Sequence, residues 1–245
     1  VVVVARNKWK AFTLYEKAAK KGHAEAQGQL GHCYEYGIGV AKDKKKAVEL
    51  YEKAAKQGSA SAQHALYKKT LEQGDAQAQY ELAERYKHGK GLLARSDWKA
   101  SRLYENAAEQ GHAEAQYELA FIYESGHGVA VDYKKAVELY EKAEKAAGLG
   151  NKNLQEHIVW IQSSLARLQT SLKNYTEAFR WHKKAAAESE YDEYEEYDHY
   201  LDAQFEVAKC YEYGQGVPKD LKKAAEWYKK AAEQGHAQAQ KNLKL

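Results

Sequence analysis

The sequence contains two cysteines, one proline and no methionine, and it has no long apolar run. No window approaches the eighteen or more uninterrupted apolar residues of a membrane helix, so no membrane insertion is expected. Cys33 and Cys210 form no Cys-x-x-Cys motif and have no clustered histidines, which predicts free thiols and no metal site. With so little proline and no alternation of β-branched residues, no strand is expected.

Charge is plentiful but unevenly distributed. Charged residues make up 30% of the chain, and the apolar share of 44% includes 20 tyrosines, which is typical of a helix-rich soluble protein. The net charge is +3, yet the segment 188–202 contributes −8 and the other residues +11. A length of 245 residues fits one or two compact domains or one elongated array.

Two phrases recur along the chain. "LYEKAAKKGHAEAQ" at Leu14 returns in similar form at Leu50, Leu103 and Trp227, and the offset from Leu14 to Leu50 is 36 residues. A second phrase, "YEYGIGV", begins at Tyr34 and returns at Tyr86, Tyr123 and Tyr211. Self-similarity at such a period indicates an array of structural repeats.

Each repeat is predicted to form two helices. In the first, Ala115, Leu119 and Tyr123 follow one another at helical spacing, and the helix stops at a Gly-x-Gly pair. The second helix ends at a glycine such as Gly58, Gly111 or Gly235. An aspartate is expected to cap the start of each second helix, at Asp43, Asp97, Asp132 and Asp220.

The combined pattern resembles a known family. Tyr-x-x-Gly-x-Gly-Val, followed by Asp-x-x-Lys-Ala-x-x-x-Tyr-x-Lys-Ala-Ala-x-Gln-Gly, resembles the Sel1-like repeat, a relative of the tetratricopeptide repeat, over residues 12–147 and 200–245. The resemblance implies an all-α fold, a right-handed α/α superhelical solenoid of about six to seven helix pairs. It also implies that the first helices line the concave face.

The chain is predicted to be a single repeat array over residues 1–245. Residues 59–74 are too short for a full repeat and are expected to form one helix, through either a change of phase or a missing segment. Leu154, Ile158, Ile161, Leu165, Leu168 and Leu172 predict one long amphipathic helix, for which core packing is favoured over a coiled coil. The predicted parts are 1–22 (partial repeat or cap), 23–58 (repeat), 59–74 (truncated repeat), 75–111 (repeat), 112–147 (repeat), 148–187 (divergent tetratricopeptide-like repeat), 188–235 (repeat with an acidic insertion) and 236–245 (capping helix).

Several patterns that resemble chemical sites have simpler explanations. The Gly-x-Gly pairs follow a helix and recur four times, which favours helix capping over a phosphate loop. The lysines behind the capping aspartates are explained as solvated helix ends, and no nucleic acid is expected as a partner. Glu196 and His199 form one Glu-x-x-His motif where a helical metal site needs two. No catalytic residue, cofactor or metal is therefore predicted.

Positions that vary between repeats are candidates for partner binding, because the fold does not fix them. On the predicted concave face the varying side chains include acidic, aromatic and histidine residues, and Tyr80 and Tyr117 are further possible aromatic anchors. The predicted partner-binding residues are Gln29, His32, Tyr36, Glu81, Glu84, His88, Glu118, Phe121, Ser125, Glu206, Lys209 and Tyr213.

The segment 188–202, "ESEYDEYEEYDHYLD", is the other candidate. Eight of its fifteen residues are acidic. The segment accounts for the excess of the 46-residue step from Trp181 to Trp227 over the repeat period of 36 residues. Ser189 followed by Asp192 predicts a capping box and a helix from about Ser189 to Tyr213. The candidate residues in it are Tyr191, Asp192, Tyr194, Glu195, Tyr197 and Asp198.

The resemblance implies a function in protein–protein interaction. We expect a non-catalytic scaffold or adaptor of bacterial origin that binds a protein or peptide on the concave face, with a monomer favoured and the compartment open between cytoplasm, periplasm and secretion. One alternative is an inhibitor or immunity-type protein that blocks a basic site with residues 188–202. Another is a hydrolase like some cysteine-rich relatives, which is disfavoured because no cysteine pair recurs and no nucleophile has an adjacent base.

Overall fold

The computed structural model describes residues 2–89, 94–187 and 197–243, and side chains at 2–6, 73, 197 and 198 are left aside. These residues form fourteen α-helices and no strand, which confirms the all-α solenoid fold class. They divide into two compact units, unit 1 (Val1–His112) and unit 2 (Ala113–Leu245). Unit 1 contains α1 (Val2–Lys20), α2 (Ala24–Tyr36), α3 (Lys44–Lys56), α4 (Ala60–Gln73), α5 (Ala76–His88) and α6 (Asp97–Glu109). Unit 2 contains α7 (Ala113–Ser125), α8 (Tyr133–Gly148), α9 (Lys152–Gln155), α10 (Ile158–Ser171), α11 (Tyr175–Ala185), α12 (Tyr197–Tyr213), α13 (Leu221–Glu233) and α14 (Ala237–Asn242).

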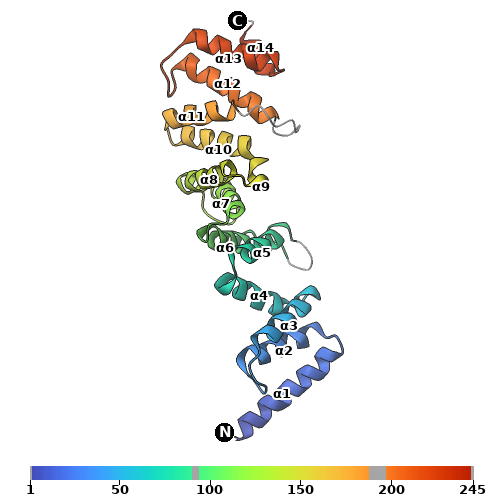
Figure 1. The fold of residues 1–245 in the computed structure, drawn as a ribbon. Helices are drawn as coiled ribbons and strands as arrows, with labels where there is room; N and C mark the ends of the chain where they lie inside the picture. Colours follow the sequence, from blue (N-terminus) through green and yellow to red (C-terminus); the bar gives the residue numbers. More distant parts are fainter. Residues whose placement is uncertain (1, 90–93, 188–196, 244–245) are drawn as a thin grey trace. The chain divides into compact units, whose positions relative to one another are not determined.

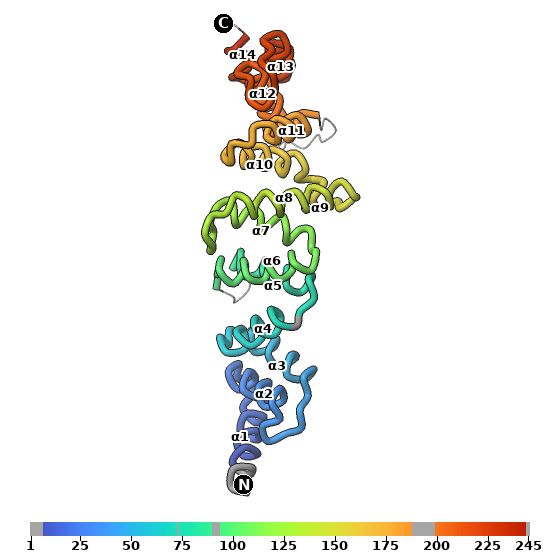
Figure 2. Tube along the Cα trace, turned by 90° about the vertical axis from the view of Figure 1, so that its left-hand side faces the viewer, coloured from blue at the N-terminus to red at the C-terminus, as the bar shows by residue number. Residues whose placement is uncertain are grey.

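Helix pairs are the packing unit of the fold (Figure 1). The closest pairs are α2 with α3, α5 with α6, α7 with α8, α10 with α11, and α12 with α13. Within each unit the helices follow one another in chain order along the stack (Figure 2). Each core therefore forms between neighbouring helices, as expected of a repeat protein.

Aspartate caps begin most of the second helices. The carboxylates of Asp43, Asp132 and Asp220 accept backbone N–H bonds three residues later at 2.9, 3.1 and 3.0 Å. The prediction for Asp97 is wrong. Ser96 caps α6 through a hydroxyl that accepts from the Lys99 backbone at 3.4 Å, while Asp97 is the first helical residue.

The Gly-x-Gly pairs cap the first helices, as predicted, and they also join neighbouring repeats. Gly214 and Gly216 both have φ of +71°, in the left-handed region that favours glycine. A Cβ atom at Gly216 would overlap the carbonyl oxygen of Tyr175 at the start of α11. A Cβ atom at Gly39 would approach the Lys8 carbonyl oxygen to 2.5 Å. The second glycine of each of these two pairs therefore permits backbone contact between repeats.

Buried glutamine side chains bridge successive helix pairs. Gln27 donates to the Ala19 carbonyl at 3.2 Å, and its own amide oxygen accepts from Gln57 at 2.6 Å. The same amide bridge links Gln110 to Gln79 at 2.7 Å, and in unit 2 it links Gln234 to Gln204 at 3.1 Å. Each bridge satisfies buried polar groups where one repeat ends and the next begins.

The truncated repeat is the single helix α4, as expected, and it serves both neighbouring pairs. Gln63 in α4 donates back to the Ala55 carbonyl at 3.4 Å, the bond that a first helix makes to the preceding second helix. Gln79 in α5 donates to the Thr70 carbonyl of α4 at 3.1 Å, so α4 also receives this bond as a second helix would. The alternation of first and second helices therefore shifts by one helix at α4.

The predicted long helix of the divergent repeat is interrupted. Asn151 caps the four-residue α9, and α10 begins only at Ile158. The side chains of Asn151 and Asn153 both donate to Glu114 of α7, at 3.1 and 3.2 Å, which fixes this turn against α7 before the chain bends. Core packing is confirmed, because Leu154 and Ile161 are buried in the core of unit 2. Both cysteines are free, as predicted, and both are buried.

Candidate functional site

A tyrosine at the same position of four second helices donates a hydrogen bond to a carboxylate of its partner helix. The hydroxyl of Tyr51 donates to Glu35 at 2.7 Å, and the hydroxyl of Tyr140 donates to Glu124 at 3.0 Å. In α5 the equivalent position holds Lys87, and the hydroxyl of Tyr104 donates to Glu84. These tyrosines are buried, and burial raises the pKa of Tyr51 and Tyr140. The tyrosines that recur at this position therefore belong to the scaffold.

Aromatic side chains of three first helices stack on histidines at the next inter-repeat turn. Tyr80 stacks on His112 and Phe205 on His236, each with ring centroids 4.6 Å apart. Tyr117 stacks on His157 at 5.5 Å. Tyr80 and Tyr117 are half-buried in these contacts. Their role as aromatic anchors for a partner stays a prediction.

In α2 the aromatic position is held by Gly28, and Ser59 stands where His112 and His236 stand. A Cβ atom at Gly28 would lie 3.3 Å from the Ser59 hydroxyl, so the chain at this point has no room for a ring. The hydroxyls of Ser59 and Ser61 donate to Glu25 at 2.8 and 2.6 Å, and these bonds lower the pKa of Glu25. Small residues thus replace the aromatic–histidine stack between α2 and α4.

A groove of about 310 Å³ opens between α2 and α4 in unit 1. His32 and Tyr36 form its α2 wall, with ring centroids 4.6 Å apart, and Tyr36 is 53% exposed. The α4 wall includes His64 and Lys68. Two predicted partner-binding residues therefore lie at a real depression in the surface, and Gln29 lies one turn before His32 on the same helix.

The predicted residues of α5 are occupied by local contacts. Glu84 holds the Tyr104 hydroxyl and lies 3.3 Å from Nε2 of His88, one turn later. Glu81 accepts a bond from Gln77 at 3.0 Å and is exposed. Glu84 therefore has a structural role that its variation between repeats did not reveal.

An aromatic cluster in unit 2 joins α7 to α10. Phe121 is 38% exposed and lies 6.1 Å from Trp160 of α10, which also lies 5.5 Å from Tyr117. Ser125 donates to the Phe121 carbonyl at 2.7 Å and lies 2.5 Å from Nδ1 of His127. Glu118 lies one turn before Phe121 and is half-buried.

Two predicted residues of α12 form an ion pair beside a half-buried histidine. Lys209 and Glu206 form an ion pair at 2.7 Å, and the Lys209 ammonium lies 5.6 Å from the centre of the Phe205 ring. Tyr213 is 62% exposed at the end of α12. Burial lowers the pKa of the neighbouring His182 to about 4, and its buried Nδ1 has no partner among the described residues.

The predicted residues thus form two separate sets. One set lies on α2 and α5 in unit 1 and the other on α7 and α12 in unit 2. We call them the unit 1 surface and the unit 2 surface. Sequence comparison between repeats missed Trp160, His64 and Lys68, which lie in α10 and α4, the helices that depart from the regular helix pairs.

The predictions in the acidic segment fall largely outside the described residues. Tyr191, Asp192, Tyr194 and Glu195 are not described, and neither is Glu196 of the Glu-x-x-His motif. Tyr197 and Asp198 are the first two residues of α12, with only their backbone described. The predicted helix is observed from Tyr197 to Tyr213.

Lysines at the start of the second helices are partly explained by the fold. The ammonium groups of Lys46, Lys135 and Lys223 lie 4.4, 4.9 and 5.4 Å from the centres of the Tyr34, Tyr123 and Tyr211 rings. Within the described ranges, no three histidine, cysteine or carboxylate groups are placed to hold a metal ion. None of the helices described here is long and apolar enough to cross a bilayer.

Comparison with known proteins identifies the repeat. The profile of the Sel1 repeat matches residues 4–23, 24–59, 76–112, 113–150, 168–189 and 201–236. The unmatched stretches between these ranges hold α4, α9, most of α10 and the first residues of α12. A search of the curated proteins found no match.

Several solved structures are similar to the chain. The protective antigen c5321, present in uropathogenic Escherichia coli strains and displaying an SLR fold, is 31% identical with a TM-score of 0.50. The match covers 96% of this chain and 51% of that one, so the chain spans about half the length of c5321. A Sel1 repeat protein from Oxalobacter formigenes is 27% identical, with coverage of 99% and 73% and a TM-score of 0.47. The immunity protein Pa5087 from Pseudomonas aeruginosa is 17% identical, with coverage of 92% and 74% and a TM-score of 0.36.

Proposed function

The chain belongs to the Sel1 repeat family, and on this premise we propose that it is a non-catalytic scaffold that binds a protein or peptide on its first helices. Proteins of this family typically mediate protein–protein interaction. The proposed contact regions are the unit 1 surface and the unit 2 surface. Both lie on first helices, which we expect, from the resemblance to Sel1-like repeats, to form the concave face.

One observation supports this proposal above the others. Side chains that stay constant between repeats are buried in structural bonds, as Tyr51 and Tyr140 are, whereas the varying position at the end of the first helix is exposed. Tyr36, His88, Ser125 and Tyr213 occupy that position and are all exposed. Residues that differ where the fold repeats, and that face solvent, are available to a partner.

The anchors differ between the two surfaces. In unit 1 the groove between α2 and α4 is lined by Tyr36 together with two histidines and two lysines. In unit 2 the cluster offers the exposed edge of Phe121 supported by Trp160. Partly exposed aromatic rings that are held by neighbours are typical interface hot spots, because they bury area without losing much side-chain entropy.

The state of the cysteines supports a non-catalytic role. Burial raises the pKa of Cys210 to about 11 and also raises the pKa of Cys33. A catalytic cysteine needs the thiolate form near neutral pH, which these environments disfavour.

Site-specific photo-crosslinking in cells of the source organism tests the proposal. A crosslinking amino acid is placed at Tyr36 and at Phe121, and as matched controls at Glu52 and Lys142, which are exposed on second helices of the same two units. We expect a discrete adduct from a first-helix position and none from the controls. Equal adducts from both helix types, or none from the first helices, would contradict the proposal.

The inhibitor hypothesis stays a prediction from the sequence, because it rests on the acidic segment. The same experiment separates it from the scaffold proposal. Adducts confined to a crosslinker at Tyr191 or Tyr194 would favour an acidic plug, whereas adducts from Tyr36 or Phe121 favour binding on the first helices.

A further inference from the structure

A second exposed surface lies at one edge of unit 2, where α8, α11 and α13 begin. The loops into these helices lie along the left-hand edge of unit 2 in Figure 1. The residue directly after each N-cap is large, apolar and exposed: Tyr133 at 40%, Tyr175 at 39% and Leu221 at 60%. We call these three residues the edge anchors.

The fold does not require apolar side chains at this position. In unit 1 the residue after the N-cap is Lys44 in α3 and Asp97 in α6. Both helices are capped and paired with a first helix although a polar residue stands there. The apolar side chains at this position in three successive second helices of unit 2 are therefore not required by the fold.

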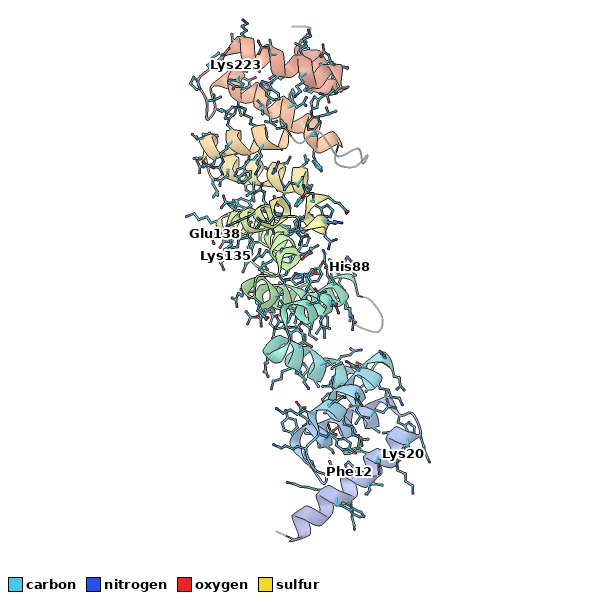
Figure 3. The ribbon with its side chains drawn as sticks, in the orientation of Figure 1. Phe12, Lys20, His88, Lys135, Glu138 and Lys223 are labelled. Atoms are coloured by element: carbon cyan, nitrogen blue, oxygen red, sulfur yellow. The ribbon has the colours of Figure 1, made fainter. Side chains whose placement is uncertain are left out.

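The edge anchors lie among lysines that have no partner in the described chain. Lys134, Lys173, Lys219 and Lys222, here called the edge lysines, are exposed and form no ion pair with a described residue. Asp132 and Asp220 hold backbone N–H groups as caps, and Glu177 lies 3.3 Å from the Arg180 guanidinium. Figure 3 shows Lys135 and Lys223 on the same edge. The edge therefore carries a local excess of positive charge.

Neighbouring repeats are in direct contact along part of this edge. The loop before α13 lies against the start of α11, since Gly216 approaches the Tyr175 carbonyl so closely that no Cβ atom fits. Tyr175 and the loop to Leu221 thus belong to one surface. Val131, just before α8, adds a further side chain that is 52% exposed.

We propose that this edge docks on an anionic lipid surface. The edge anchors protrude singly from successive helix starts, so a folded protein would need a separate matching pocket for each. A bilayer interface accepts protruding side chains at any spacing, and tyrosine is favoured at the level of the headgroups. Lysines near an anionic leaflet each contribute about 1 kcal/mol, which corresponds to about fivefold in binding.

Vesicle flotation tests this proposal with the full chain. The probe is vesicles of phosphatidylglycerol and phosphatidylcholine in equal parts, compared with phosphatidylcholine alone. We expect flotation with the anionic vesicles only. Replacing two edge lysines with alanine, Lys219→Ala with Lys222→Ala, is expected to weaken binding about 25-fold. Replacing the three edge anchors with serine is expected to weaken it further while leaving the thermal unfolding midpoint unchanged.

A matched variant controls for net charge. Lys142→Ala with Lys145→Ala changes the charge equally but lies about 13 Å or more along α8 from Tyr133. It is expected to float like the parent chain. Equal loss in both variants, no flotation of the parent chain, or binding of polyglutamate instead of vesicles would overturn the proposal. The outcome is independent of the crosslinking from Tyr36 and Phe121, so either proposal can fail alone.

Discussion

The hydroxyl of Tyr104 donates its hydrogen bond to Glu84, one turn away from the position that holds the acceptor in three other helix pairs. The usual acceptor position in α5 holds Lys87 instead. The fold therefore keeps a carboxylate within reach of the buried tyrosine although the local sequence has changed. A buried hydroxyl without an acceptor is costly, which explains why the acceptor moved and was not lost.

Glu84→Ala is expected to lower the free energy of unfolding by about 1–3 kcal/mol, because the Tyr104 hydroxyl then stays buried without an acceptor. Lys87→Glu added to this variant is expected to restore most of the loss by placing the carboxylate where the other pairs have it. Urea unfolding measures both changes.

His88→Ala is the control for the second contact of Glu84, which it makes with a 45% exposed histidine side chain. This variant is expected to change the free energy of unfolding by less than about 0.5 kcal/mol. If Lys87→Glu restores none of the free energy of unfolding lost in Glu84→Ala, the inference that either position can hold the acceptor for Tyr104 is wrong.

The parts of the fold that were predictable from the sequence depend on neighbours along the chain. The stop at Gly126 and the cap at Asp132 follow from local spacing, and both appear in the structure. The break before α10 depends on Asn153 meeting Glu114, which lies 39 residues earlier, and helical periodicity carries no sign of such a contact. Ser96 was missed because an aspartate directly follows it in the sequence.

Gly216→Ala is expected to destabilise the protein more than Gly214→Ala does. Both glycines have φ of +71°, so each substitution carries the left-handed strain of about 1–2 kcal/mol. Only at Gly216 would the new Cβ atom overlap the Tyr175 carbonyl, whereas at Gly214 its closest neighbour lies at 3.4 Å. The additional loss is expected to be about 1–3 kcal/mol. Thermal unfolding compares the pair, and equal losses would show that the repeats do not contact each other here.

Phe121→Ala is expected to weaken binding of the partner identified by crosslinking at least fivefold, a loss of about 1 kcal/mol or more. Stability should change less than in a core substitution, because the ring is already 38% exposed. Leu149→Ala is the control, since Leu149 is 80% exposed at the far end of α8. Isothermal titration calorimetry measures both affinities. Similar affinities for the two variants would remove Phe121 from the proposed interface.

The candidate site was less predictable than the fold, for a physical reason. Comparing repeats finds positions that vary, but a side chain also varies when its structural partner has moved. Glu84 was selected for its variation and proved to hold Tyr104. Trp160 was not selected because α10 departs from the repeat and offers no equivalent position to compare. Only the three-dimensional contacts separate these two cases.

His182 is expected to make the protein less stable as the pH falls from about 6.5 to about 4. Burial lowers the pKa of this imidazole from 6.5 to about 4. Between these two pH values the ring is protonated in the unfolded chain but stays neutral in the folded chain, which favours unfolding. The stabilisation is complete above pH 6.5, and a loss on the order of 2 kcal/mol is expected by pH 4. His182→Gln should flatten the difference between unfolding free energies measured at these two pH values. His64→Gln, at an exposed position of α4, should leave it unchanged. A parent chain whose pH dependence survives His182→Gln would show that other groups, and not this buried ring, control its acid stability.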